Sequence, residues 1–276
     1  MPETIVKKFG RKILSPFLGK FFLQDFYEQL QLLGMKGRNF GMGSMLELSG
    51  EQSAIITVAN RLKAQGLSKP VVFDVGANIG EYSLFVDKIF SRYFKDFHIF
   101  SFEPAVSIYS ELKKKTSSVK HIQPINAGLS NSSQSRTLFI NKQFNATSSL
   151  YKENLSNFDL KIDVQEQVTL FTLDLFCEQN NISKINFLKI DTEGHELLVL
   201  GGAKKMLASG KISFIQFEMG RTSINARVFF KDFFELLTPQ YQLYRILKNG
   251  LQPINIYKET DEVFLTTNYL AELRKP

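Results

Sequence analysis

The pattern of apolar and polar positions from residue 70 onward alternates between two periods. Short apolar runs bounded by Gly, Pro or polar residues predict buried strands, and longer stretches with apolar residues three or four apart predict helices. This alternation is typical of an α/β fold with a mostly parallel sheet and helices on both faces. We expect seven strands, at about residues 71–73, 98–102, 119–123, 185–190, 212–217, 241–247 and 262–267.

Residues 1–69 lack this alternation and form a predicted N-terminal helical extension to a domain spanning residues 70–276. Residues 1–40 are basic and amphipathic, and a further helix is expected to begin at a capping box of Ser49 and Gln52. The extension is interpreted as a cap over a substrate cleft, as helices packed on the domain, or as an interfacial helix on an anionic membrane. No apolar stretch reaches the roughly 18 residues of a spanning helix, and no secretory signal pattern is found.

A strand–turn–helix unit near residue 74 organises the predicted domain. Asp74 ends the first strand, Gly76 and Gly80 frame a tight turn, and a helical pattern follows. Glycines in such a turn let backbone amides approach a ligand closely, as in nucleotide-type sites. A carboxylate at Asp74 would repel a pyrophosphate but suits a cationic, phosphate-free cofactor such as S-adenosylmethionine. The spacing is G-x-x-x-G, not the G-x-G-x-x-G of dinucleotide-binding proteins; a plain strand–turn–helix without a ligand is the alternative.

Polar residues follow the other predicted strands. Glu103 lies 23 positions after Gly80, close to the spacing of about 20 at which an acid meets a ribose hydroxyl. Asn126 and Ala127 follow the third strand, where an adenine is expected. Ligands of open α/β sheets bind beyond the carboxyl ends of the strands, so these residues are expected to share one cleft. Four more follow the fourth and fifth strands: Asp191, Glu193, His195 and Glu218.

Five motifs resemble, in order and spacing, those of the FkbM family of S-adenosylmethionine-dependent methyltransferases. They are Asp74–Gly80 (DVGANIG), Phe102–Pro104 (FEP), Asn126–Ser130 (NAGLS), Ser148–Leu150 (SSL) and Leu188–Glu196 (LKIDTEGHE), within about residues 70–220. The resemblance implies a Rossmann-like class I methyltransferase fold, S-adenosylmethionine as cofactor, and O-methylation, often of a sugar hydroxyl. The motifs and strand ends together predict the cofactor-binding residues Asp74, Gly76, Asn78, Gly80, Glu103, Pro104, Asn126, Ala127 and Asp191.

A long segment at about residues 131–170 separates the third and fourth strands. It contains two strand-like runs, Arg136–Asn141 and Gln167–Leu173, which are predicted to pair. Long insertions beside the carboxyl edge of a parallel sheet often carry the substrate. For the serines in its hydroxyl-rich middle, a simple turn is the alternative. The predicted substrate-binding residues are Ser148, Ser149, Glu193 and Glu218.

Methyl transfer to a hydroxyl requires a group that removes the proton of the acceptor. His195 is predicted as this base, because it follows a strand at the cleft edge and an imidazole pKa of about 6.5 suits the task at neutral pH. A purely structural imidazole is the alternative. Asp191 is the second candidate, either as the base or as a partner of the cofactor's amine. We expect no bound metal; a magnesium site built from Asp191, Glu193, His195 or Glu218 is the alternative.

Composition and charge narrow these possibilities only partly. The chain has 276 residues, of which 43% are hydrophobic, and a formal net charge of +7. A basic balance is compatible with nucleic acid, anionic lipid or phosphorylated glycan precursors. The single cysteine, Cys177, lies in an apolar helical pattern and is expected to be a buried thiol. One cysteine excludes an internal disulfide and suits a reducing cytoplasm.

Taken together, these features predict a cytoplasmic O-methyltransferase, with possible contact to the inner membrane face through residues 1–40. The expected acceptor is a sugar hydroxyl of a cell-surface glycan or its precursor, and DNA is not an expected partner. An RNA ribose methyltransferase and a natural-product O-methyltransferase are the alternatives on the same fold. An NAD-dependent oxidoreductase fits less well, because the third glycine is missing and Asp74 is present. A non-catalytic binding module with a degenerate site is a further alternative.

Overall fold

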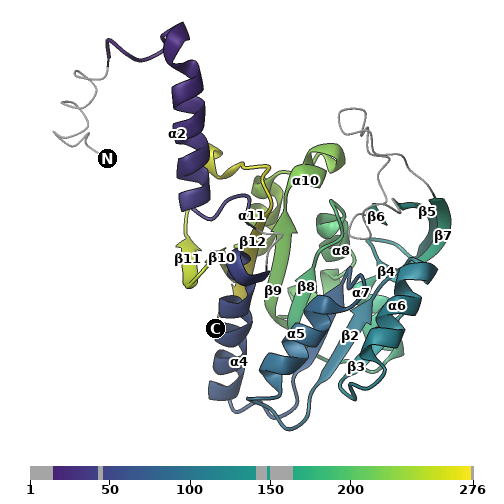
Figure 1. Ribbon diagram of the computed structural model, residues 1–276. Helices are drawn as coiled ribbons and strands as arrows, with labels where there is room; N and C mark the ends of the chain where they lie inside the picture. The colour runs from purple at the N-terminus through teal and green to yellow at the C-terminus, as the bar shows by residue number, and fades with distance from the viewer. Residues whose placement is uncertain (1–14, 43–45, 141–147, 150–163, 275–276) are drawn as a thin grey trace.

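The fold is built on an eight-stranded sheet with the strand order β11-β10-β12-β9-β8-β1-β2-β3 (Figure 1). The computed structural model describes residues 15–42, 46–140, 148–149 and 164–274. Strands β3, β2, β1, β8 and β9 run parallel, whereas β12, β10 and β11 are each antiparallel to the strand before them in the sheet. The bounds are β1 Val71–Val75, β2 His98–Phe102, β3 Ile122–Ile125, β8 Ile185–Ile190, β9 Ile212–Met219, β10 Tyr241–Leu247, β11 Gly250–Ile254 and β12 Thr267–Leu273.

The predicted fold class is confirmed, with two corrections at the antiparallel edge. The expected count of seven strands is wrong, because β11 forms an eighth strand in a hairpin with β10. Its Pro253 cannot donate to a ladder, which disfavours any strand that is not at an edge. The last strand begins at Thr267 and not at residue 262. Glu262 instead accepts hydrogen bonds from the backbone N–H groups of Phe230 and Lys231.

Helices cover both faces of the sheet, and the alternation of side chains along β1 decides which face each core residue joins. Val72 packs with α4 (Glu51–Ala64) and α5 (Glu81–Phe90). Phe73 packs on the opposite face with the helices that follow β7, β8 and β9. Cys177 is buried there, as predicted. These helices are α7 Leu173–Gln179, α8 Glu196–Gly201, α9 Lys204–Ala208 and α11 Phe230–Leu237; α6 Val106–Thr116, α10 Arg221–Ala226 and η2 Glu259–Asp261 complete the domain.

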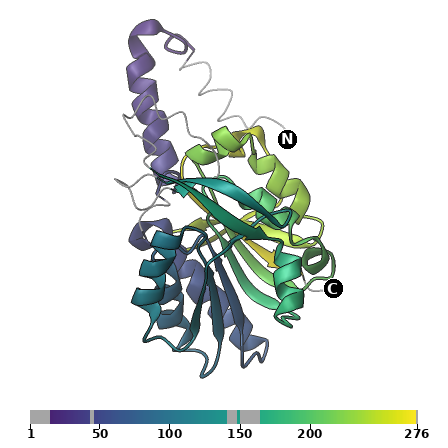
Figure 2. The ribbon, with the colours of Figure 1, turned by 90° about the vertical axis from the view of Figure 1, so that its right-hand side faces the viewer.

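A smaller sheet, in the order β4-β7-β5-β6, lies in the long segment between β3 and β8 (Figure 2). β5 and β7 pair antiparallel, with Arg136 opposite Val168, so the predicted pairing of these two runs is confirmed. β4 pairs parallel with β7 and carries the chain away from the main sheet. The bounds are β4 Gly128–Leu129, β5 Gln134–Ile140, β6 Ser148–Ser149 and β7 Val164–Phe171.

The N-terminal helices differ sharply in their packing. α4 buries residues such as Ile55 and Val58 in the core, whereas η1 (Phe21–Leu23) and α2 (Gln24–Gly37) bury no residue. Figures 1 and 2 both show α2 projecting from the body. The predicted capping box is wrong: α3 (Leu46–Ser49) precedes α4, and the Ser49 hydroxyl accepts from the backbone N–H of Glu51. Within the described residues, no helix combines the length and apolar character needed to cross a membrane.

Candidate active site

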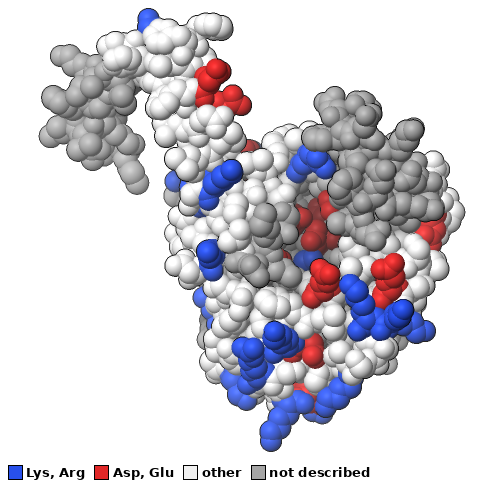
Figure 3. Space-filling model, viewed as in Figure 1, with Lys and Arg blue, Asp and Glu red and all other residues white. Residues whose placement is uncertain are grey.

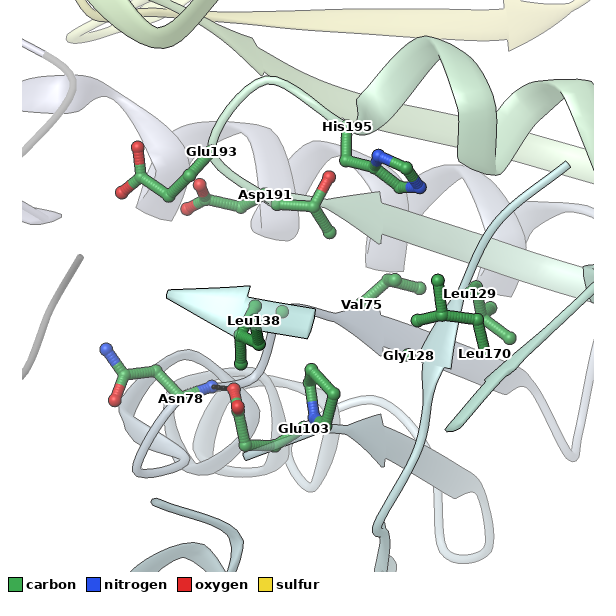
Figure 4. Close-up of a pocket in the computed structure, with 13 residues that line it drawn as sticks. Val75, Asn78, Glu103, Gly128, Leu129, Leu138, Leu170, Asp191, Glu193 and His195 are labelled. Carbon is green, nitrogen blue, oxygen red and sulfur yellow. Dashed lines mark hydrogen bonds between the residues drawn. The ribbon is translucent and has the colours of Figure 1, made fainter. Parts of the chain in front are cut away.

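A pocket opens beyond the carboxyl ends of β1, β2 and β8, where the strand order of the parallel sheet predicts a ligand. Its empty space is about 650 Å³ when the part open to solvent is included, within the range of small-molecule sites. Figure 4 shows Glu103 and Asn78 on one side and Asp191, Glu193 and His195 on the other. The lining residues are Val75, Gly76, Asn78, Glu103, Pro104, Gly128, Leu129, Leu138, Leu170, Asp191, Thr192, Glu193 and His195.

The turn after β1 requires glycine at both predicted positions. Gly76 has a φ of +83°, and a Cβ there would lie 1.8 Å from the carbonyl oxygen of Asp191. Gly80 has a φ of +88°, and its Cβ would meet the Leu112 side chain at 2.6 Å. Gly76 lines the pocket, whereas Gly80 does not and instead begins α5. The first glycine therefore lets β1 and β8 approach each other at the pocket floor, and the second lets α5 pack on α6.

Asp74 lies beneath the pocket and not on its surface. The side chain is fully buried, accepts a hydrogen bond from Ser83 Oγ at 2.6 Å and has Lys189 Nζ 3.9 Å from its other oxygen. Burial raises the pKa of Asp74, and the nearby Lys189 and Ser83 oppose this rise. The sequence placed its carboxylate in the turn, next to the ligand. In the structure the carboxylate does not line the pocket, and Lys189, 3.9 Å away, lies between it and Asp191 in the ion-pair cluster.

Glu103 and Asn78 form the side of the pocket nearest β2. The Glu103 carboxylate accepts hydrogen bonds from the backbone N–H groups of Asn78 at 3.1 Å and Ala105 at 3.0 Å. Burial raises the pKa of Glu103 to about 7, although these two hydrogen bonds lower it. The buried Oδ1 of Asn78 has no hydrogen-bond partner among the described residues. A donor from a ligand would satisfy this oxygen.

The loop after β3 supports this side and adds an apolar wall. Asn126 donates from Nδ2 to the carbonyl oxygens of Glu103 and Pro104, both at 3.0 Å, and thereby fixes the loop that carries Glu103. Pro104 lines the pocket, whereas Ala127, which follows Asn126, is buried and does not line it. Sequence reasoning missed the wall itself. It consists of Gly128, Leu129, Leu138 and Leu170, contributed by β4, β5 and β7.

A row of buried polar side chains crosses the sheet under the opposite side of the pocket. Asp74, Lys189 and Gln216 lie in register on β1, β8 and β9. Lys189 Nζ is 3.0 Å from Asp191 Oδ2 and 4.6 Å from the centroid of the Tyr82 ring. Burial disfavours its charge, but Asp191, Asp74 and a further carboxylate outweigh burial and raise the pKa of Lys189. The ammonium is therefore held as a cation beside Asp191.

The row continues through Tyr82 to the N-terminal helices. The Tyr82 hydroxyl donates to Gln216 Oε1 at 2.9 Å, and Gln216 Nε2 donates to Glu51 Oε1 at 2.8 Å. Glu51 opens α4 and is itself buried, and burial raises its pKa despite the nearby Lys189. Nothing in the local sequence predicts this chain of contacts, because Glu51 and Gln216 are 165 positions apart.

Glu218 lies next to Asp191 without lining the pocket. Burial, and then the negative charges of Asp191 and Glu193, raise the pKa of Glu218 well above its ordinary value, and its carboxyl is hydrogen-bonded to Asp191. This favours the protonated form of Glu218. Acidic side chains gather along a hollow near the middle of the face shown in Figure 3. In the described part of the chain, no group of three or more His, Cys, Asp or Glu side chains is arranged to hold a metal ion.

His195 sits at the N-terminus of α8 and is almost completely buried, at 1% exposure. Its Nε2 lies 2.9 Å from Ser130 Oγ. Burial, together with the positive charge of Arg136, lowers the pKa of His195 to about 4. The imidazole is therefore neutral near pH 7, and its titration lies far from the working range expected from the sequence.

The loop from Asp191 to His195 is fixed by a neighbouring carboxylate. Glu196 Oε1 accepts from the backbone N–H groups of Thr192 at 2.7 Å and Gly194 at 3.2 Å. Glu193 lines the pocket and has a φ of 53°, a left-handed conformation that is unusual outside glycine. The strained loop thus holds Asp191 and Glu193 toward the pocket. The side chains of Ser148 and Ser149 lie outside the described residues, and only their backbone pairing in β6 with β5 is seen.

The pocket suits a cationic adenosyl cofactor. Glu103 offers a buried acceptor for ribose hydroxyls, and the apolar wall offers a surface for the adenine ring. Asn78 Oδ1 can accept a hydrogen bond from the cofactor. The carboxylates of Glu103, Asp191 and Glu193 line the pocket. Lys189 does not line it and is paired with Asp74 and Asp191. This excess of negative charge favours a sulfonium and an ammonium group over a pyrophosphate.

Comparisons with known proteins agree with this assignment. The sequence profile of the Methyltransferase FkbM domain matches residues 74–246. Methyltransferase 1 of Beauveria bassiana is 30% identical over 146 residues, which cover 48% of this chain and 57% of that protein. Hexuronic acid methyltransferase AglP of Haloferax volcanii is 28% identical over 177 residues, which cover 63% of this chain and 65% of that protein. The chain thus spans less than two thirds of the length of either relative.

Among solved structures, the methyltransferase FkbM from Methylobacillus flagellatus is similar to this chain, with a TM-score of 0.43 and 17% sequence identity. The superposed region covers 74% of this chain and 43% of that chain.

Proposed function

The chain belongs to the FkbM methyltransferase family, and from this premise we propose that it transfers a methyl group from S-adenosylmethionine to a sugar hydroxyl. S-adenosylmethionine is its cofactor, as the sequence predicted. The observation that carries the proposal is the position of Asp191, which lines the pocket with its Oδ2 3.0 Å from the buried ammonium of Lys189. We assign the acceptor to a cell-surface glycan or its precursor, because a relative 28% identical over 177 residues is a hexuronic acid methyltransferase.

The cofactor would be held by residues on both sides of the pocket. Glu103 would accept hydrogen bonds from the ribose hydroxyls, and Asn78 Oδ1 would accept from the amino-acid portion or the ribose. Leu138 and Leu170 would pack against the adenine. When bound, S-adenosylmethionine supplies a methyl group made electrophilic by the sulfonium. The neighbouring carboxylates favour the positive charge of that group in the binding site.

We propose Asp191, and not His195, as the base that removes the proton of the acceptor hydroxyl. The Asp191 side chain is 31% exposed and reaches the pocket, so an acceptor hydroxyl can approach it. Lys189 donates a hydrogen bond to its Oδ2 at 3.0 Å and thereby orients the carboxylate. His195 is buried and has a pKa of about 4, which makes its imidazole a weak base. A well-positioned general base, the role proposed for Asp191, contributes typically 10²–10⁴-fold to the rate.

The place of action follows from the proposed acceptor. Precursors of cell-surface glycans that are linked to lipids are presented at the inner face of the membrane. We therefore assign the enzyme to the cytoplasm, close to that face. An acceptor of this kind also accommodates the basic net charge of +7, because such precursors carry phosphate groups.

The test is transfer of label from S-adenosylmethionine with a radioactive methyl group into separate fractions of lipid-linked glycan, capsular polysaccharide and RNA. We expect label in a glycan fraction that survives mild alkali, because a methyl ether is stable there. Label in RNA overturns the acceptor assignment. Label that mild alkali releases shows a methyl ester, and overturns transfer to a hydroxyl.

A matched pair of variants tests the base. Asp191→Asn should lower turnover by about 10²–10⁴-fold while calorimetry shows little change in adenosylhomocysteine binding. Glu235→Gln, an exposed acidic residue on α11, is the control and should keep full turnover. Wild-type turnover in Asp191→Asn, measured on the same acceptor, contradicts the assignment.

A further inference from the structure

The first described helices carry a row of large apolar side chains that are more than half exposed among the described residues. Phe22, Phe26, Leu30 and Leu33 follow one another at helical spacing and therefore share one face. They are 76%, 61%, 51% and 67% exposed. We refer to these four residues as the Phe22 face. Phe21, at its N-terminal end, is 93% exposed.

This exposure follows from the position of the helix. α2 projects away from the sheet in both ribbon views, and none of its residues is buried or lines the pocket (Figures 1 and 2). Soluble domains rarely leave a contiguous apolar surface of this kind in water, and where they do it marks an interaction site. The same helix does not contribute to the core, so the stability of the domain gives no reason for its apolar residues.

The charge of the sequence that precedes the Phe22 face points to its partner. The sequence before α2 is strongly basic, with Lys7, Lys8, Arg11, Lys12 and Lys20 against a single acidic residue, Glu3. Aromatic and aliphatic residues on one helix face beside a cluster of basic residues are typical of segments that lie in the interface of anionic membranes. Each basic residue near such a surface adds to the attraction.

A second copy of the chain is a poorer occupant. The apolar row covers only part of the 14 residues of α2, whereas a coiled-coil pair requires three to four heptads. Asp25 and Glu28 also lie on this helix, away from the apolar arc. In an interfacial helix these two side chains face water, as the polar arc of such a helix does.

We propose that the Phe22 face inserts into the interfacial region of an anionic membrane and anchors the enzyme there by α2. The four side chains enter the boundary between headgroups and acyl chains, and the basic sequence before them pairs with the anionic headgroups. The projecting helix keeps the pocket outside the membrane, in water. This inference concerns a surface outside the pocket and holds for any acceptor.

The experiment uses the full chain and two kinds of vesicle, one of phosphatidylcholine alone and one of phosphatidylcholine and phosphatidylglycerol in equal amounts. Wild-type protein should sediment with the anionic vesicles, bind neutral ones at least about tenfold more weakly, and be released by 0.5 M NaCl. The double variant Phe22→Gln/Phe26→Gln should bind the anionic vesicles at least about tenfold more weakly than wild type. Because both side chains are exposed, its melting temperature should be unchanged.

The control is Ile256→Gln, which replaces an exposed apolar residue, 73% exposed, far along the chain from α2. It should bind vesicles as wild type does. Equal binding by the double variant and wild type overturns the proposal, as does equal binding of wild type to both kinds of vesicle. Light scattering gives the remaining outcome: a wild-type dimer that the double variant dissociates, without vesicle binding, assigns the face to a second copy and overturns membrane anchoring.

Discussion

Replacing Glu103 by glutamine tests two consequences of burying a carboxylate in the cofactor pocket: the pH dependence of stability and the affinity for the cofactor. The side chain is 3% exposed, and burial raises its pKa from 4.5 to about 7. Since the folded protein holds this proton more tightly than the unfolded chain, folding favours the protonated form. The stability that this proton contributes is complete below about pH 4.5 and is lost as the pH rises through about 7. Glutamine cannot titrate, so Glu103→Gln lacks this loss.

The magnitude follows from the size of the pKa shift. A shift of about 2.5 units corresponds to about 3 kcal/mol, at 1.36 kcal/mol per unit. The free energy of unfolding of Glu103→Gln, minus that of wild type, should therefore increase by about 3 kcal/mol between pH 4.5 and pH 8. The variant also loses an acceptor for one of the N–H groups of Asn78 and Ala105. That loss costs about 1–3 kcal/mol at every pH and does not change the difference between the two pH values.

Urea unfolding of both proteins from pH 4.5 to pH 8 measures this difference, and calorimetry with adenosylhomocysteine at pH 8 measures the functional consequence. Without the charged acceptor, binding should weaken by about 1.5–3 kcal/mol, which is about 10- to 150-fold in the dissociation constant. Glu111→Gln, an exposed position on α6, is the control and should change neither quantity. A difference in unfolding free energy that stays constant with pH refutes a buried Glu103 of raised pKa.

Three further outcomes follow from the same geometry. Lys189→Met should destabilise the protein by about 3–5 kcal/mol in urea unfolding, because Asp74 and Asp191 lose the cation 3.9 and 3.0 Å away; a loss below 1 kcal/mol contradicts this. His195→Gln should keep turnover close to that of wild type at pH 7, since the imidazole has a pKa of about 4 and is neutral there; a loss of about 10²-fold or more would instead identify His195 as the base. Gly76→Ala should abolish cofactor binding in calorimetry, because the added Cβ would lie 1.8 Å from the Asp191 carbonyl oxygen; wild-type affinity argues against the close approach.

The sequence predicts the parts of the site that depend on chain order. The end of each parallel strand is readable from a short apolar run, and all such ends meet at one edge of the sheet. Glu103, Asp191 and Glu193 were placed at that edge from these runs alone, and all three line the pocket. The glycines of the first turn were found for the same reason. Whether these residues bind the cofactor or the acceptor stays a prediction.

The direction of a side chain at a strand end is harder to predict, and Asp74 shows why. Side chains alternate along β1, so Asp74 shares a face with Val72, under α5, while Val75 faces the pocket side. The alternation is visible in the sequence, but which face opens to ligand depends on the helices that cover each face. The apolar wall has a different origin. Leu138 and Leu170 reach the pocket only because β5 and β7 pair across 24 to 36 positions of sequence and pack against Ile108 of α6.

One electrostatic property connects the stability of the fold with the choice of cofactor. Lys189 is the cation of a buried cluster in which Asp74, Asp191 and Glu51 are its carboxylate partners, so negative charge is in excess when all of them are ionised. Burial raises the pKa values of Asp74 and Glu51, and the negative charge of Asp191 adds to the rise. A ligand that brings positive charge lowers such pKa values, whereas a pyrophosphate adds to the negative charge. The electrostatics of this buried cluster therefore favour a sulfonium over a pyrophosphate in the adjoining pocket.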